Sequence, residues 1–159
     1  MELFLKDDDI IVSKTDLKGK ITYGNQVFIH FSGYSEVELL GQPHNIIRHP
    51  DMPKCVFKLL WDRIQGGEEI FAYVVNRAKS GDYYWVFANV TPSFDAKGKI
   101  IGYYSVRRKP KPEAIRAIQG IYKALLEAET RGGMGAGTQL LETTLLSKGV
   151  SYDAFVLSL

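Results

Sequence analysis

Residues 69–108 read EIFAYVVNRAKSGDYYWVFANVTPSFDAKGKIIGYYSVRR, and this stretch decides the fold. It contains three runs rich in aromatic and β-branched residues, which favour strands: Glu69–Ala78, Tyr83–Thr91 and Lys99–Arg108. The two connections, Lys79–Asp82 and Asp95–Gly98, are short and each contains a glycine, as hairpin turns require. The stretch therefore predicts a three-stranded antiparallel meander.

The side chains of the middle strand alternate between the two faces of the predicted sheet. One face receives Tyr84, Val86, Ala88 and Val90, and the other receives Tyr83, Trp85, Phe87 and Asn89. Both faces carry apolar residues, so each needs a cover that excludes water. We expect short helices to cover one face, and either the C-terminal helices or another protein to cover the aromatic face.

Two short strands and three helices are predicted before the meander. The strands are Ile10–Ser13 and Lys20–Tyr23, joined by a turn at Asp16–Gly19. The predicted helices run from Asn25 through Phe31, from a capping box of Ser35 and Glu38 to Gly41, and from Asp51 and Pro53 to Gly66 and Gly67. This order predicts an α+β fold: a five-stranded antiparallel sheet with short helices on one face and a cup between them.

The composition changes at Lys109–Pro112, where aromatic and β-branched residues give way to alanine, leucine, glutamate and lysine. Residues 111–131 predict an amphipathic helix, which could pair with itself in a homodimer, with the sheet or with a partner. The glycines that follow predict a flexible break before two short helices, Gln139–Lys148 and Tyr152–Leu159. The predicted division is an N-terminal segment (1–9), a globular domain (10–110), the amphipathic helix (111–131), and a glycine linker with a helical tail (132–159).

The charge balance argues against nucleic acid as the main partner. The chain of 159 residues has 20 Lys and Arg against 18 Asp and Glu, a net charge of +2, whereas proteins that bind phosphate backbones carry a basic excess. No run approaches the roughly 20 apolar residues that span a bilayer. The single cysteine, Cys55, suits a reducing compartment. We therefore expect a cytoplasmic protein that does not itself insert into a membrane.

One segment carries a more specific signal. Residues 41–53 read GQPHNIIRHPDMP, and they are followed by Trp61 and by the run NRAKSGDYYWV at residues 76–86. With this HNxxRHPDMP pattern, the chain resembles the flavin-binding PAS domain of bacterial aerotaxis (Aer) receptors over roughly Ile11–Arg108. It most resembles the stand-alone, CetB-like type of energy-taxis protein, which works with a separate membrane-bound transducer.

The resemblance implies a PAS fold that holds FAD without a covalent bond. It places Arg48, His49 and Asp51 at positions important for binding, Trp61 in the wall of the cup, and Asn76 near the isoalloxazine ring. The residue types agree with these roles. Arg48 offers a planar cationic fork for a phosphate, and Asn76 can both donate and accept hydrogen bonds. Asp51 could accept from ribose hydroxyls or simply cap a helix.

The resemblance also implies a redox or energy sensor, not an enzyme, that signals to a membrane-bound methyl-accepting chemotaxis transducer. Through this partner the protein would reach the inner membrane. We expect the contact on the sheet face that bears Trp85, Phe87 and Asn89, unless the helix at 111–131 folds back over it. The alternatives are a heme-binding gas sensor of the same fold, with a histidine as axial ligand, and a cofactor-free PAS interaction module.

Catalytic patterns are weak in this sequence. His30, His44 and His49 are not spaced as paired metal ligands. Cys55 lies on an apolar-periodic helix and is expected to be a small buried hydrophobe. A photochemical cysteine adduct is not expected, because the position of the reactive cysteine in light-sensing flavin domains corresponds here to Gly41–His44. The chain also lacks a phosphate-binding glycine loop and a nucleophile elbow.

Overall fold

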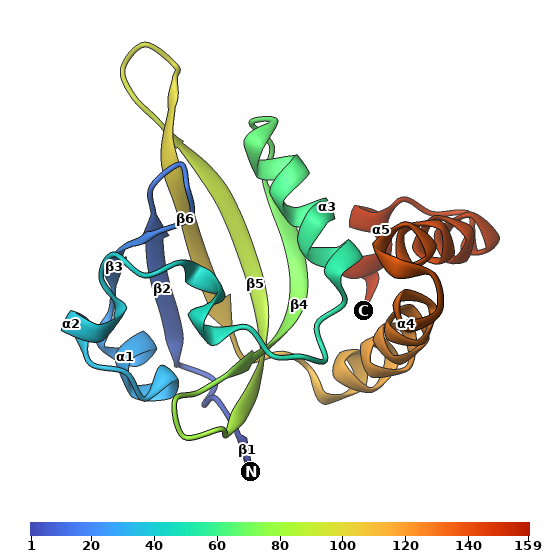
Figure 1. Cartoon of the computed structure of the whole chain (residues 1–159), viewed down its shortest axis with the longest axis horizontal. Coiled ribbons are helices and arrows are strands. Elements are labelled where there is room, and N and C mark those ends of the chain that lie inside the picture. The colour runs from blue at the N-terminus through green and yellow to red at the C-terminus, as the bar shows by residue number, and fades with distance from the viewer.

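The computed structural model describes all 159 residues as one six-stranded sheet with helices on both faces (Figure 1). The strands are β1 (Glu2–Leu3), β2 (Ile10–Thr15), β3 (Ile21–Gly24), β4 (Ile70–Arg77), β5 (Tyr83–Phe94) and β6 (Ile100–Arg108). The helices are α1 (Gln26–Ser32), α2 (Glu36–Leu39), the 3-10 helix η1 (His44–Ile47), α3 (Lys54–Gln65), α4 (Pro112–Lys148) and α5 (Tyr152–Ser158). This architecture confirms the predicted α+β fold.

The sheet contains the five expected antiparallel strands in the order β4-β5-β6-β2-β3. A sixth strand, β1, pairs in parallel with the start of β5 at Tyr83 and Tyr84, so the sheet is mixed. Strands β2 and β6 lie unusually close at Gly102, where a Cβ would overlap the carbonyl of Thr15. The glycine is therefore required by close backbone approach.

Helices α1, α2 and α3 and the 3-10 helix η1 lie over the inner face of the sheet (Figure 1). Asn25 caps α1 by accepting from the Phe28 N–H, and Ser35 caps α2 by accepting from the Glu38 N–H. Both caps agree with the sequence-based prediction. The core between these helices and the sheet is apolar; among its largest fully buried side chains are Phe28, Ile11, Leu39, Ile47, Ile64 and Val56.

The C-terminal part forms a helical hairpin. The chain turns at Gly133, which has φ 76° and ψ −170°, while the residues on either side of it are helical. The predicted flexible linker is therefore reduced to one residue, and the remaining glycines belong to helices. Gly137 is needed for packing, because a Cβ there would lie 2.7 Å from Cγ of Glu129.

The hairpin and α5 cover the outer face and the free edge of β4, which pairs only with β5. The hydroxyl of Tyr122 donates to the Tyr73 carbonyl at 2.6 Å, and that of Tyr152 donates to the Phe71 carbonyl at 3.0 Å. These bonds occupy backbone groups that an open edge would expose. Of the two expected covers for the aromatic face, the C-terminal helices are the one present. None of the helices is long and apolar enough to cross a membrane.

Candidate functional site

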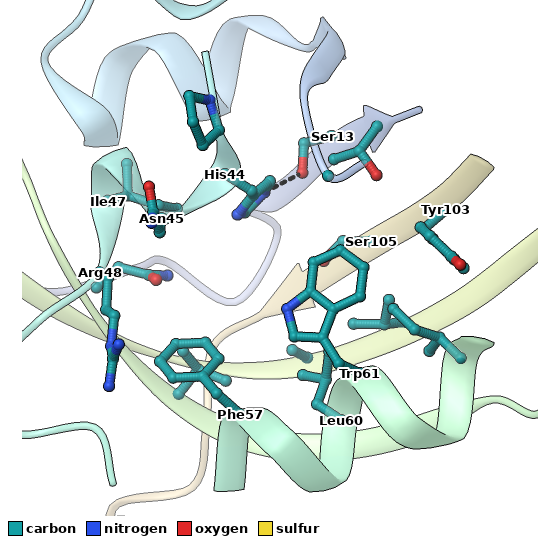
Figure 2. A pocket seen from close by; sticks show the side chains of 18 of the residues that line it. Ser13, His44, Asn45, Ile47, Arg48, Phe57, Leu60, Trp61, Tyr103 and Ser105 are labelled. Carbon is teal, nitrogen blue, oxygen red and sulfur yellow. Dashed lines mark hydrogen bonds between the residues drawn. The ribbon is translucent and has the colours of Figure 1, made fainter. Parts of the chain in front are cut away.

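A cavity of about 360 Å³ lies between the inner face of the sheet, α3 and the segment at η1 (Figure 2). Its volume falls within the range of small-molecule pockets. Residues from all these elements line it, including Thr15, His44, Phe57, Leu60, Val74, Ala88, Val90, Tyr103 and Ser105. The lining surface is largely apolar and includes several polar groups, which is the composition of a site for a small organic ligand.

Trp61 forms one wall of this cavity. It projects from α3, and its ring meets the ring of Tyr103 edge to face, with centroids 5.5 Å apart (Figure 2). The same ring lies against Gly19 in the β2–β3 turn, where a Cβ would approach Cη2 to 2.8 Å. Gly19 also has a φ of 82°, so both space and backbone conformation exclude a side chain there. The turn and α3 thus hold the indole in place.

Arg48 lies at the end of η1 and lines the cavity. Its guanidinium is 4.8 Å from the ring centroid of Phe57, and Nη2 donates to the Met52 carbonyl at 3.4 Å. The backbone of Arg48 bridges that of Asn76, and the Met52 sulfur accepts from the Val75 N–H at 3.4 Å. These contacts fix the η1 segment to β4 beside the cavity.

Asn76 occupies an inward-facing position of β4 and also lines the cavity. It is only 4% exposed, and its Nδ2 has no hydrogen-bond partner. A buried amide without a partner is rare in folded proteins and needs an explanation. Arg48, Trp61 and Asn76, which the sequence places far apart, therefore share one cavity.

His49 and Asp51 lie outside the cavity lining. The Asp51 backbone N–H donates to Nδ1 of His49 at 3.0 Å, and the imidazole packs 5.6 Å from the Tyr83 ring centroid. The Asp51 side chain is 72% exposed. The expectation that Asp51 caps α3 is wrong, because the helix begins at Lys54 and its cap position is Pro53, without a side-chain bond.

The cap of α3 comes instead from the C-terminal hairpin. Oε1 of Glu129 accepts from the Lys54 N–H at 2.9 Å, and Oε2 accepts from the Cys55 N–H at 2.8 Å. A carboxylate at a helix N-terminus satisfies unpaired donors and interacts favourably with the helix dipole. Burial, together with this carboxylate, raises the pKa of the Cys55 thiol to about 12. Cys55 is buried and does not line the cavity.

The sequence-based prediction did not include three polar residues of the cavity, which are Ser13, His44 and Arg107. Arg107 on β6 donates from Nη2 to Ser13 Oγ at 2.6 Å, and Ser13 bonds to Nε2 of His44 at 2.9 Å. Burial lowers the pKa of His44 to about 3, so its ring is neutral. One signal in the sequence could have identified Arg107: it is a charged residue at an inward position of a predicted strand.

The three histidines lie in different surroundings. No group of three His, Cys, Asp or Glu side chains is close enough to hold a metal ion. His30 is exposed on α1. His44 is the histidine that lines the cavity, and its ring stacks on Phe28 with centroids 5.9 Å apart. An axial-ligand role for Nε2 would require loss of its bond to Ser13.

The outer face of the sheet is partly closed by the hairpin. Trp85 is 8% exposed, and its ring lies 6.1 Å from that of Tyr122, so α4 covers it. Phe87 is half-buried against Phe71 and Tyr73. Asn89 is also half-buried and donates from Nδ2 to the Ile70 carbonyl at 3.3 Å. The three residues predicted for partner contact therefore differ in access, and Trp85 is hidden from a partner.

Comparison with known proteins identifies the class of protein to which this fold belongs. The family described as PAS fold matches residues 21–107, and the chain belongs to it. Within this class, the chain is 47% identical over 126 residues to the aerotaxis receptor of Escherichia coli strain K12, covering 79% of this chain and 25% of the receptor. It therefore spans about a quarter of that receptor.

Solved structures agree on the fold. The dark structure of the light-oxygen-voltage domain of the blue-light photoreceptor Aureochrome1 superposes with a TM-score of 0.62 at 22% identity, covering 67% of this chain and 80% of that one. A light-oxygen-voltage domain studied with a flavin analogue gives a TM-score of 0.61 at 20% identity, covering 72% and 86%. At these identities the likeness concerns the fold.

Proposed function

We propose that this PAS domain binds FAD without a covalent bond and acts as a redox or energy sensor. One observation carries the proposal: Arg48, Trp61 and Asn76 come together in a cavity of ligand size. The 47% identity to an aerotaxis receptor supports it, as does the likeness of the fold to a light-oxygen-voltage domain studied with a flavin analogue. FAD would supply reversible electron uptake, and the protein would supply its binding and electrostatic environment.

The residues present fit a flavin. The apolar lining and the Trp61 ring suit a flat aromatic ring system, and the unpartnered amide of Asn76 suits its pyrimidine edge. Arg48 suits a phosphate. We assign His49 and Asp51 to the part of FAD beyond the phosphates, because they follow Arg48 on the same loop outside the cavity.

The proposed signal leaves through β4. Asn76 lies three residues after Tyr73, whose carbonyl accepts from the Tyr122 hydroxyl of α4. A change in the hydrogen bonds of Asn76 would reach the C-terminal hairpin along this strand. The receiver is a membrane-bound methyl-accepting chemotaxis transducer, and the protein acts in the cytoplasm, at the inner membrane through this partner. The protein signals without catalysing a reaction. It acts as a monomer or as a homodimer.

An absorption spectrum of the purified protein tests this function. We expect the bands of oxidised flavin and the release of FAD on denaturation, identified by chromatography. A Soret band would identify the heme alternative, and a spectrum without either would favour a cofactor-free interaction module.

The Arg48→Ala variant tests the phosphate contact. We expect a folded protein with at least about tenfold lower flavin content, because the phosphate loses a charge-assisted hydrogen bond. Arg77→Ala is the matched control, since Arg77 is exposed at the end of β4 and outside the cavity lining. Stoichiometric FAD in Arg48→Ala after gel filtration would remove Arg48 from the binding site.

A further inference from the structure

Arg107 is a buried cation without a carboxylate partner. It is 2% exposed, and none of the ion pairs in the molecule includes it. Its Nη2 bonds to Ser13, whereas Nε and Nη1 have no partner. Desolvation lowers the pKa of Arg107 to about 10, so the guanidinium remains charged at neutral pH. Burying an unpaired charge is strongly unfavourable, and stability alone gives no reason for it.

The contact with the Phe28 ring offsets only part of the free-energy cost of burying Arg107. The guanidinium carbon lies 4.7 Å from the ring centroid, a cation–π contact. Such a contact contributes about 2 kcal/mol when desolvated, which is less than the cost of several kcal/mol for a buried ion. It also leaves the N–H groups of Nε and Nη1 without acceptors.

The other unpartnered polar atoms lie on the same face of the sheet. Four buried side-chain atoms lack a hydrogen-bond partner: Asn76 Nδ2, Tyr84 Oη, and Nε and Nη1 of Arg107. These residues occupy inward positions of the three consecutive strands β4, β5 and β6, and Asn76 pairs with Tyr84 in register. Burial raises the pKa of Tyr84 to about 12, although the positive charge of Arg107 opposes the shift, so its hydroxyl keeps its proton. The cluster is thus a set of donors with one positive charge.

A donor cluster with a positive charge selects the chemistry of its ligand. It suits an edge that presents carbonyl oxygens and ring nitrogens as acceptors, and it favours a form of that edge with more negative charge. Because Asn76 and Arg107 both line the cavity, such a ligand would meet the cluster from the cavity side. The dioxopyrimidine edge of a flavin presents two carbonyl oxygens and a ring nitrogen as acceptors, beside one N–H donor.

We propose that Arg107, with Asn76, forms the subsite for the dioxopyrimidine edge of the flavin and stabilises the negative charge that this edge gains on reduction. The inference rests on the proposed function and deepens it. The electron comes from an external reductant, and Arg107 stays protonated throughout. Only its electrostatic interaction with the ring changes, so Arg107 makes the reduced flavin bind more tightly relative to the oxidised one.

The test measures flavin affinity in both redox states. Apoprotein is titrated with FAD under air and with FAD reduced by excess dithionite under anaerobic conditions, for the wild type, Arg107→Gln and Arg107→Lys. Arg108→Gln is the matched control, because Arg108 is the exposed neighbour on β6 and makes the same change in charge. Circular dichroism confirms that each variant is folded.

For Arg107→Gln we expect the preference for reduced over oxidised flavin to fall at least about tenfold. This corresponds to a midpoint potential lower by about 59 mV for a one-electron couple or about 30 mV for a two-electron couple. Arg107→Lys should retain most of the preference because it keeps the charge, and Arg108→Gln should match the wild type.

Two results would overturn the inference while the proposed function stands. One is an unchanged preference in Arg107→Gln. The other is complete loss of both flavin forms from folded Arg107→Gln and Arg107→Lys alike, which would make Arg107 a packing residue. A wild-type protein that neither contains nor takes up flavin would instead overturn the proposed function and the inference with it.

Discussion

At the scale of single residues, the site is organised around polar groups that the protein leaves without partners. Asn76 and Arg107 are both buried at the cavity, and both retain free donors. Leaving a buried donor unsatisfied costs about 1–3 kcal/mol, so these residues lower the stability of the protein unless a ligand supplies the acceptors. His44, by contrast, is neutral, and its Nε2 is bonded to Ser13.

Asn76 allows a direct test of the electrostatics. Asn76→Asp would put a negative charge beside a ring that becomes more negative on reduction. We expect the reduced form to be disfavoured at least about tenfold, a midpoint potential lower by about 59 mV for one electron. A spectroelectrochemical titration measures it. Asn89→Asp places the same charge on the opposite face and should leave the potential near that of the wild type. An unchanged potential in Asn76→Asp with flavin bound would exclude Asn76 from the redox response.

At the scale of elements, α3 connects the cavity to the C-terminal hairpin. Its side chains Phe57 and Trp61 line the cavity, while its first N–H groups bond to Glu129 of α4. Gly137, on the second arm of the hairpin, leaves room for that carboxylate. The N-terminus of the helix that forms the cavity wall therefore depends on a residue 75 positions away in sequence.

Removing this contact should destabilise the whole domain. Glu129→Ala deletes two hydrogen bonds to a helix N-terminus, and we expect a loss of about 2 kcal/mol in the free energy of unfolding. For a chain of this size the melting temperature would fall by about 4–8 °C. Thermal denaturation followed by circular dichroism measures the change, with Glu127→Ala, an exposed residue of the same helix, as control. Equal melting temperatures for the two variants would show that Glu129 does not support α3.

At the scale of the whole molecule, the hairpin covers one part of the outer face of the sheet and leaves another part accessible to solvent. Trp85 is covered by α4, while Phe87 and Asn89 remain half-buried. A partner that binds this face would contact the sheet and the hairpin together. This arrangement would let one partner respond to a change that passes from β4 to α4.

Phe87→Glu tests whether the uncovered part of this face binds the transducer. Because Phe87 faces away from the cavity, we expect the flavin spectrum to be retained. Loss of its contacts with Phe71 and Tyr73 should cost about 1–3 kcal/mol. Co-purification with the membrane transducer should be lost, whereas Phe94→Glu, at an exposed site near the β5–β6 turn, should preserve it. Retained co-purification of Phe87→Glu would move the interface to the C-terminal helices.

The sequence alone determined the elements that depend on local interactions. The three long strands follow from the alternation of aromatic and β-branched residues, and the hairpin turns follow from glycines at positions of positive φ such as Gly81 and Gly98. The caps of α1 and α2 lie within three residues of the N–H groups that they bind. Each of these features is decided by neighbours in the chain, so a local pattern is sufficient to predict it.

Only the tertiary structure decided what depends on distant segments. The short strand β1 pairs with β5 far away in the sequence, and the first N–H group of α3 is satisfied by Glu129, 75 residues away. The burial of Arg107 without a counter-charge depends on how β2, β6 and η1 meet around it. Such contacts join residues tens of positions apart, and their energies arise only when packing removes the groups from water, which no local pattern records.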